Sequence, residues 1–302
     1  MRTLCLASHI PPSNQSGFAL MLVLSVLILL GLLGSSFSAQ VQVEIRSTAW
    51  LADQSRLQAA AQAGILYGLM QATHPNQRLR WRLDNQPHAF DWQGYPLTIR
   101  LLSERGRIDL NLAPRSVFVG LFKHLLPNAS ADKLADALID WRDADDRTRL
   151  LGSELTDYQR AGRSYGPANR PFIEVAELAE VLGFNRSTLT KLRPYLTVHA
   201  RRSRIDATAA DVAVIAALPG ILPSQAEQFV ARREWALGAN QAIDFSLLSA
   251  AQHFIDTQSA SPVLAIQVQI NPANEPVYQV EAIIRLPTKK AGYQVLHSAQ
   301  LF

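Results

Sequence analysis

Ser16-Gly17-Phe18-Ala19-Leu20-Met21-Leu22-Val23 is the stretch that decides how this chain is organised, because a polar leader gives way there to an apolar run. No charged residue occurs between Phe18 and Val43, and about 20 apolar residues suffice for a helix to cross a bilayer. A secretory signal peptide is cleaved after its apolar stretch, whereas the most suggestive junction here, Gly17/Phe18, lies before it. Cleavage there would leave the apolar helix on the mature protein as a membrane-anchored rod with a globular head.

Length and composition indicate an ordinary folded protein. The 302 residues favour two domains, or one domain with a large insertion. Hydrophobic residues make up 48% and charged residues 18%, which does not favour disorder. The net charge of +4 is too diffuse to indicate nucleic-acid binding. The single cysteine, Cys5, lies in the leader, so a chain cut after Gly17 has no thiol for a disulfide or a metal.

The helical pattern does not stop at the end of the apolar run. Apolar residues recur at steps of three and four as far as Met70, and no proline interrupts the chain between Phe18 and Thr73. His74-Pro75-Asn76 is a helix-ending sequence. We therefore expect one transmembrane and spine helix over residues 18–75. The alternative is a transmembrane helix followed by a separate amphipathic helix.

The remaining chain has a strand, helical block, strand pattern. Short β-rich runs follow the spine at residues 81–83, 89–92 and 97–102, and further strands are predicted at residues 263–270, 277–286 and 293–301. Helical patterns dominate from Pro114 to about Ile255. This order is expected when a helical domain is inserted into a sheet.

The helical block contains a loose repeat. Asp109–Pro114 and Asp206–Ala210 each form a polar start before an apolar helix, and Leu218-Pro219-Gly220-Ile221 looks like the hairpin of a helix-hairpin-helix unit. Such hairpins present backbone N–H groups to a phosphate and favour two glycines, whereas this chain has only Gly220. A membrane-tethered DNA-binding protein of an uptake system is therefore an alternative function, although we do not expect nucleic acid as a partner.

Enzyme motifs are scarce, and we expect a protein without catalytic residues. The sequence has no P-loop, dinucleotide-binding glycine pattern, HExxH or CxxC motif. Gly162-Arg163-Ser164-Tyr165-Gly166 matches G-x-S-x-G, but polar residues precede it and Pro167 follows it, unlike a nucleophile elbow. An exported hydrolase with an ordinary signal peptide cut near Ser38 is a third hypothesis.

One acidic cluster has the composition of a cation site. Calcium takes six to eight oxygen ligands, and a carboxylate-rich loop can supply them. An EF-hand pattern is absent, so a solvated loop paired with neighbouring arginines remains the alternative. The candidate ligands are Asp140, Asp143, Asp145, Asp146, Glu154 and Asp157.

The leader ending in Gly17 resembles a type IV prepilin processing site. More specific motifs follow along the chain: Arg107-Ile108-Asp109-Leu110-Asn111-Leu112-Ala113-Pro114, Leu138-Ile139-Asp140-Trp141-Arg142-Asp143-Ala144-Asp145-Asp146, Pro167-Ala168-Asn169-Arg170-Pro171-Phe172 and Leu192-Arg193-Pro194-Tyr195-Leu196-Thr197-Val198. Together and in this order, these motifs resemble the K-type minor pseudopilin of the type II secretion system over nearly the whole chain.

The resemblance implies an α+β fold, in which a pilin-like N-terminal helix packs on an antiparallel sheet. A large inserted all-α domain would contain helix-hairpin-helix (SAM-like) units. The implied parts are a prepilin leader at 1–17, the transmembrane and spine helix at 18–75, a first β part at 76–108, the inserted domain at 109–258 and a second β part at 259–302.

The resemblance also implies a function in assembly. The chain would cap the tip of the pseudopilus and initiate its assembly for protein export across the outer membrane. Its partners would be the I- and J-type minor pseudopilins, prepilin peptidase and the inner-membrane secretion platform. It would lie in the inner membrane of a Gram-negative bacterium as a single-pass protein with its head in the periplasm.

Particular residues take roles from the same resemblance. Prepilin peptidase would cleave between Gly17 and Phe18, and Phe18 would be N-methylated. Structural calcium would bind near the acidic loop, although Leu155 and Thr156 stand where the family often has further acids. The fifth mature residue, usually Glu in pilins, is Leu22 here. A tip subunit has no neighbour whose ammonium needs neutralising, so a neutral residue is acceptable there.

Overall fold

The computed structural model describes residues 16–257, 261–271, 277–286 and 292–300. The predicted leader therefore lies outside the described residues, apart from its last two positions. The chain divides into two units, Met1–Ala59 and Ala60–Phe302, and each is treated by itself below.

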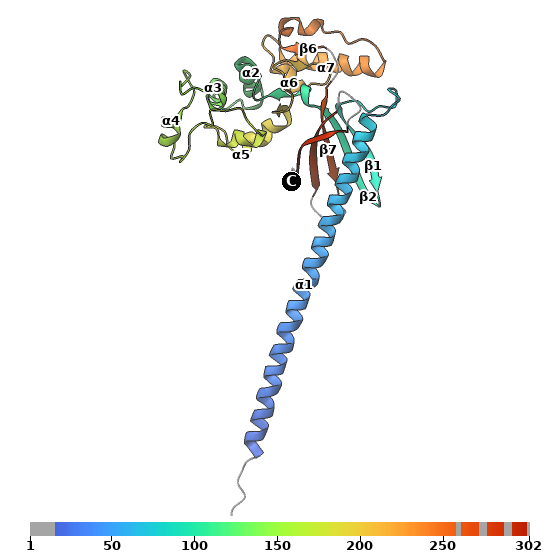
Figure 1. The fold of residues 1–302 in the computed structure, drawn as a ribbon, viewed down its shortest axis with the longest axis vertical. Helices are drawn as coiled ribbons and strands as arrows, with labels where there is room; N and C mark the ends of the chain where they lie inside the picture. The colour runs from blue at the N-terminus through green and yellow to red at the C-terminus, as the bar shows by residue number, and fades with distance from the viewer. Residues whose placement is uncertain (1–15, 258–260, 272–276, 287–291, 301–302) are drawn as a thin grey trace, which may run out of the picture. The chain divides into compact units, whose positions relative to one another are not determined.

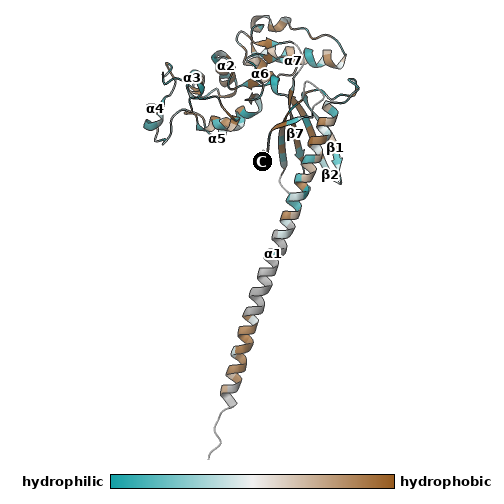
Figure 2. Ribbon diagram, in the orientation of Figure 1, coloured by the Kyte–Doolittle hydropathy of each residue, from teal (hydrophilic) through white to brown (hydrophobic). Residues whose placement is uncertain are grey.

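One helix, α1, spans Ser16–Ala72 without a break and ends just before His74-Pro75 (Figure 1). This helix overlaps the range 18–75 predicted as a transmembrane and spine helix, while the pilin-like spine role stays a prediction. The described apolar side chains near its start, such as Phe18 and Leu22, are exposed, and Figure 2 shows hydrophobic residues along the described turns there.

The expected localisation needs correction. A helix that crosses a membrane requires roughly 20 consecutive apolar residues. Across the described parts of the chain, we find no helix whose length and apolar character would let it span a bilayer. This finding contradicts the single-pass inner-membrane placement, with a periplasmic head, that the sequence had led us to expect.

A five-stranded antiparallel sheet forms one part of the unit 60–302, in the order β1-β2-β7-β8-β9. β2 and β7 are neighbours, with Leu97 opposite Ile270 and Ser103 opposite Leu264. The residues between β2 and β7 therefore form an insertion: the chain leaves the sheet at the end of β2 and re-enters it in the neighbouring strand, β7. The strands are β1 Asp84–Trp92, β2 Tyr95–Ser103, β7 Val263–Ile270, β8 Tyr278–Arg285 and β9 Gln294–Gln300.

The last turns of α1 lie close against this sheet because two glycines face it. A Cβ at Gly64 would lie 2.8 Å from Val268, and one at Gly68 would lie 3.0 Å from Ile266. Alternate residues of β2, such as Ile99, are fully buried. The period-2 pattern of the sequence thus produces one buried face, which the end of α1 covers.

The insertion has its own hydrophobic core, centred on Phe118, Phe122, Tyr158 and Phe229, all fully buried. Its helices are α2 Arg115–Leu125, α3 Ala131–Arg142, α4 Leu155–Arg160, α5 Arg186–Leu192, α6 Val212–Ala216 and α7 Pro223–Gly238. Short 3-10 helices complete it: η1 Glu104–Gly106, η2 Val175–Glu180, η3 Arg193–Tyr195 and η4 Ser246–Ala251.

The insertion is not purely helical, which corrects the all-α expectation. It contains two pairs of two-residue strands, and each pair joins segments that are distant in the sequence by parallel strand pairing. β3 Ile108–Asp109 pairs with β4 Leu196–Thr197, and β5 Ile205–Asp206 pairs with β6 Ile255–Asp256. The predicted strand at 81–83 is also wrong, since those residues precede β1 without strand pairing.

The loose repeat has a structural counterpart. Arg142 donates to the carbonyl oxygens of Leu110 and Ala113, and Arg233 donates to those of Ala207 and Ala210. Each arginine therefore holds, by hydrogen bonds to the backbone, the turn that follows a short parallel strand, β3 or β5. α6 and α7 flank the Leu218–Ile221 turn, while the helix-hairpin-helix assignment itself stays a prediction.

Candidate metal centre

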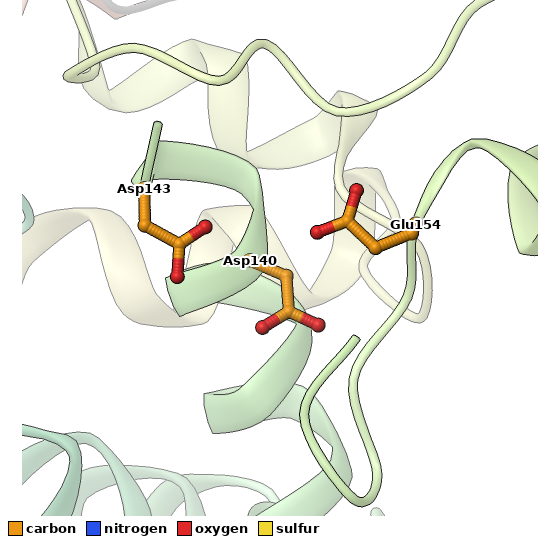
Figure 3. A group of neighbouring side chains, drawn as sticks. All are labelled: Asp140, Asp143 and Glu154. Atoms are coloured by element: carbon orange, nitrogen blue, oxygen red, sulfur yellow. The ribbon is translucent and has the colours of Figure 1, made fainter. Parts of the chain in front are cut away.

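Three of the six predicted acids meet at one point. Ligand atoms of Asp140, Asp143 and Glu154 all lie within 4.8 Å of one another. Asp140 lies in the last turn of α3, and Asp143 caps the end of that helix with an extended backbone. Figure 3 shows their carboxylates beside that of Glu154, which immediately precedes α4.

Asp140 holds the loop that brings Glu154 to the other two acids. Its Oδ2 accepts the backbone N–H groups of Arg149 at 3.1 Å and Ser153 at 3.0 Å. A turn between these residues is closed by the N–H of Gly152, which donates to the carbonyl oxygen of Arg149 at 3.0 Å. The side chain of Asp140 is completely buried, so this loop closure is sequestered from solvent.

The oxygens of this site lack the hydrogen bonds that buried oxygens normally have. Among the described residues, Asp143 Oδ1 and both carboxylate oxygens of Glu154 are buried without a hydrogen-bond partner. Asp140 Oδ1 has no hydrogen bond either, although Arg149 Nε lies 3.3 Å away. A cluster of buried hard oxygen donors fits a cation such as calcium.

The electrostatics of the site favour an added positive charge. Burial, followed by repulsion from Asp140 and Asp143, raises the pKa of Glu154 to about 7. Burial also raises the pKa values of Asp140 and Asp143 above their ordinary range. Arg149 is the nearest counter-charge, and its Nη2 lies 3.7 Å from Asp143 Oδ2.

The other three predicted acids have different contacts. Asp145 accepts the N–H of Arg147, and Asp146 accepts a hydrogen bond from Asn169 Nδ2 at 2.9 Å. Asp157 accepts the N–H of Glu154 at the start of α4 and pairs with Arg160 at 2.6 Å. The described structure does not bring these three acids into the Asp140 cluster.

Sequence reasoning missed one residue that shapes this site. A Cβ on Gly152 would lie 1.8 Å from Asp140 Oδ2, so any larger residue would displace that carboxylate. Asn169 has a left-handed backbone with φ of 48° and a buried Oδ1 without a hydrogen-bond partner, but its Nδ2 contacts Asp146, which lies outside the cluster. The only sequence signal for Asn169 was its place in the Pro167–Phe172 motif.

The predicted processing residues lie far along the sequence from this cluster. Gly17 and Phe18 occupy the first turn of α1, and the side chain of Phe18 is 74% exposed. Leu22 follows one turn later and is also exposed. Nothing in the described structure tests their roles.

Comparisons of the sequence with known proteins all match type II secretion system protein K. Residues 99–201 match the family model described as type II secretion system (T2SS), protein K. Type II secretion system protein K of Pseudomonas aeruginosa is 28% identical over 244 residues, covering 73% of each chain. The protein of the same name from Klebsiella pneumoniae is 25% identical, covering 84% of this chain and 85% of the relative.

A solved structure shares the fold. The match is to a chain from the crystal structure of the GspK-GspI-GspJ complex of the enterotoxigenic Escherichia coli type 2 secretion system. It covers 84% of this chain and 99% of the matched chain, with 18% identity and a TM-score of 0.59. The mixed helix and antiparallel-sheet fold is thereby confirmed, and so is the resemblance that the sequence motifs indicated.

Proposed function

We infer that this chain is a K-type minor pseudopilin of a type II secretion system, a structural component rather than an enzyme. The observation that carries this inference is the family match over residues 99–201, which begins within β2 and continues into the insertion. The DNA-binding alternative receives no support, because both curated relatives are secretion proteins.

We propose further that the chain caps the pseudopilus tip and initiates assembly together with I- and J-type minor pseudopilins. The insertion supports this placement, since a bulky domain between β2 and β7 would hinder stacking inside a filament. Leu22 supports it as well, because a buried carboxylate without a cationic partner is costly and leucine avoids that cost. Contact with the secretion platform would follow from this role.

Labelled pseudopili test the tip assignment. An epitope tag placed after Asn240, in the exposed loop that follows α7, should appear by electron microscopy at one end of each filament. A tagged major pseudopilin in the same preparation serves as the control and should label the whole length. Tags on this chain distributed along the filament would contradict the proposal.

Processing by prepilin peptidase is a separate prediction. Mass spectrometry of the mature N-terminus should show a chain that begins at Phe18 and is one methyl group heavier than the unmodified sequence. Replacing Gly17 by valine should leave the leader attached, because a bulky side chain would then occupy the position before the cleaved bond. A native chain that begins near Ser38 would favour the exported-hydrolase hypothesis instead.

We also propose that the acidic cluster holds a structural calcium ion. Asp140, Asp143 and Glu154 would supply carboxylate oxygens. Bound there, the ion would neutralise the clustered charge. The support is the set of buried oxygens without hydrogen bonds, together with donor chemistry that suits a hard cation.

Gly152 offers a stringent test of that geometry. Replacing it by alanine should lower the free energy of unfolding by roughly 1–3 kcal/mol, because the added methyl group displaces the Asp140 carboxylate. Calcium binding, followed by isothermal titration calorimetry, should weaken at least tenfold. The matched control is Gly238→Ala, since a Cβ there meets nothing within 4 Å. Equal effects of the two substitutions would contradict the predicted site.

A further inference from the structure

Arg149 places a cation of the protein itself on the acidic cluster formed by Asp140, Asp143 and Glu154. Its Nε lies 3.3 Å from Asp140 Oδ1, and its Nη2 lies 3.7 Å from Asp143 Oδ2. These are the only ion pairs that the three acids form among the described residues. The guanidinium group therefore bridges two of the three carboxylates that would hold a metal ion.

Asp140 has only one oxygen free for a metal ion, and Arg149 lies beside that oxygen. Oδ2 already accepts the backbone N–H groups of Arg149 and Ser153, whereas Oδ1 is buried without a hydrogen bond. An ion bonded to Oδ1 would be a near neighbour of a guanidinium group with the same sign of charge. Because like charges at close range repel each other, the ion and the guanidinium group compete for this oxygen.

The side chain of Arg149 can leave the cluster without opening the loop. Its backbone N–H donates to Asp140 Oδ2 at 3.1 Å, and its carbonyl oxygen accepts the N–H of Gly152 at 3.0 Å. These contacts hold the main chain whether or not the guanidinium group stays. The side chain of Arg149 is 44% exposed, and Leu150 beside it is 96% exposed. An ion pair so close to solvent is weak, so its loss costs little.

The charges of the cluster favour a divalent ion over the arginine. One guanidinium group faces three carboxylates, and it forms no ion pair with Glu154, whose two oxygens are buried without hydrogen bonds. The other nearby arginine, Arg142, donates to the carbonyl oxygens of Leu110 and Ala113 and is held there. A calcium ion brings twice the charge of Arg149 and accepts several carboxylate oxygens at once.

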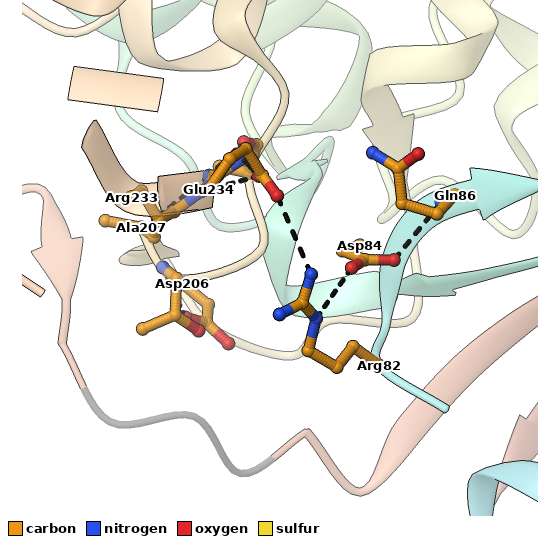
Figure 4. A network of polar contacts seen from close by, with 9 residues as sticks. Arg82, Asp84, Gln86, Asp206, Ala207, Arg233 and Glu234 are labelled. Carbon is orange, nitrogen blue, oxygen red and sulfur yellow. Dashed lines mark hydrogen bonds and ion pairs between the residues drawn. The ribbon is translucent and has the colours of Figure 1, made fainter. Parts of the chain in front are cut away.

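A second arginine bridge shows what a balanced network looks like (Figure 4). Arg82 is also 44% exposed, and it lies 2.8 Å from Asp84 and 3.9 Å from Glu234. Arg233 contacts Glu234 at 2.8 Å, so two arginines face two acids there. Asp84 also accepts the N–H of Gln86 at 3.2 Å. Equal exposure of the two bridging arginines thus leaves the surplus of acids as the difference between the networks.

We propose that calcium and the side chain of Arg149 compete for the same oxygens, so that calcium binding moves the guanidinium group away from Asp140 and Asp143 into solvent. This inference rests on the proposed calcium site and assigns it an affinity-setting residue. Arg149 offsets part of the charge of the cluster when calcium is scarce. Its displacement then opposes calcium binding and lowers the affinity of the site.

Calcium titration of the full chain by isothermal titration calorimetry tests the competition. Arg149→Met should bind calcium roughly tenfold more tightly than the parent chain, because the competing positive charge is gone. Arg149→Lys keeps the charge but not the planar fork, and its affinity should lie between the two. The matched control is Arg147→Met, which removes the same charge from an exposed position of the same loop. Its affinity should stay within about threefold of the parent value, because solvent screens exposed charges.

A second measurement follows the displacement in the parent chain and needs no variant. The NMR signal of the Arg149 Nε–H group should shift, and its exchange with water should become faster, as calcium saturates the site. Arg82 provides an internal reference, since its Nε–H donates to Asp84 at 2.8 Å in the balanced network. The Arg82 signal should not respond to calcium.

The outcomes separate this inference from the calcium site on which it rests. If neither the parent chain nor Arg149→Met binds calcium, the site itself is wrong and the inference falls with it. If the parent chain binds calcium but the Arg149 signal does not respond, or if Arg149→Met binds no more tightly, the site stands and the competition is wrong. Calcium binding by Arg149→Met alone would show a guanidinium group that excludes the ion, which supports the competition.

Discussion

Replacing Arg107 by methionine should lower the free energy of unfolding by about 3–5 kcal/mol, the cost of breaking a buried ion pair from one side. Arg107 Nη1 donates to Glu104 at 2.9 Å, and Nη2 donates to Glu281 at 2.8 Å. Glu104 is fully buried and Glu281 is 6% exposed. Methionine would leave both carboxylates without a cation, at the point where the insertion departs from the sheet.

Matched variants separate charge from packing. Arg107→Met combined with Glu104→Gln and Glu281→Gln should recover most of the lost stability, because no buried charge is then left unpaired. The surface control is Arg232→Met, whose partner Asp244 lies 3.9 Å away, with both side chains 60% exposed. That exposed pair should contribute no more than about 1 kcal/mol. Chemical denaturation that shows equal losses for Arg107→Met and Arg232→Met would contradict the buried-network interpretation.

The pH dependence of the Arg107 effect follows from Glu281. Burial opposes the charged form of Glu281, but the attraction and hydrogen bond of Arg107, together with the hydrogen bond from Gln267, hold the pKa below its ordinary value. A carboxylate with a lowered folded-state pKa stabilises the protein above its unfolded-state pKa, and that stabilisation is lost as the pH falls through the folded-state value. The deficit of Arg107→Met should therefore be largest near neutral pH and should shrink in acid.

Much of the sheet could be predicted because the pattern of apolar residues along each strand matches the residues that are buried in the structure. The run predicted at 263–270 is the same as β7, and the run at 97–102 lies inside β2. The two-residue strands β3 to β6 could not be predicted, since so short a segment has no period to detect. The buried ion pair of Arg107 could not be predicted either, because its partner Glu281 lies 174 residues away in the sequence.

The candidate site was predictable in composition but not in geometry. The sequence indicated that Asp140, Asp143 and Glu154 belong to one acidic cluster. It could not show that Asp140 would accept two N–H groups from the loop and thereby bring Glu154 alongside. The direction of each side chain decides which acids join the cluster. Asp157 caps the start of α4, Asp145 accepts a hydrogen bond from Arg147, and Asp146 accepts one from Asn169.

Replacing Glu154 by glutamine should change stability in opposite directions with and without calcium. Both oxygens of Glu154 are buried without hydrogen bonds, beside Asp140 and Asp143. In calcium-free buffer the neutral amide relieves this repulsion, so the free energy of unfolding should rise by roughly 1 kcal/mol. At calcium concentrations about 100 times the dissociation constant, the parent chain should gain about 2.7 kcal/mol, and the variant should lose most of that gain.

Thermal melts with and without calcium measure both effects, with Asp145→Asn as the matched control. Asp145 belongs to the same loop, but the hydrogen bond that its carboxylate accepts comes from the exposed Arg147 backbone, so its calcium response should stay close to that of the parent chain. A calcium response unchanged in Glu154→Gln would remove Glu154 from the site. Destabilisation of that variant in calcium-free buffer would mean that its carboxylate has a stabilising partner even without metal, contrary to the geometry of the cluster.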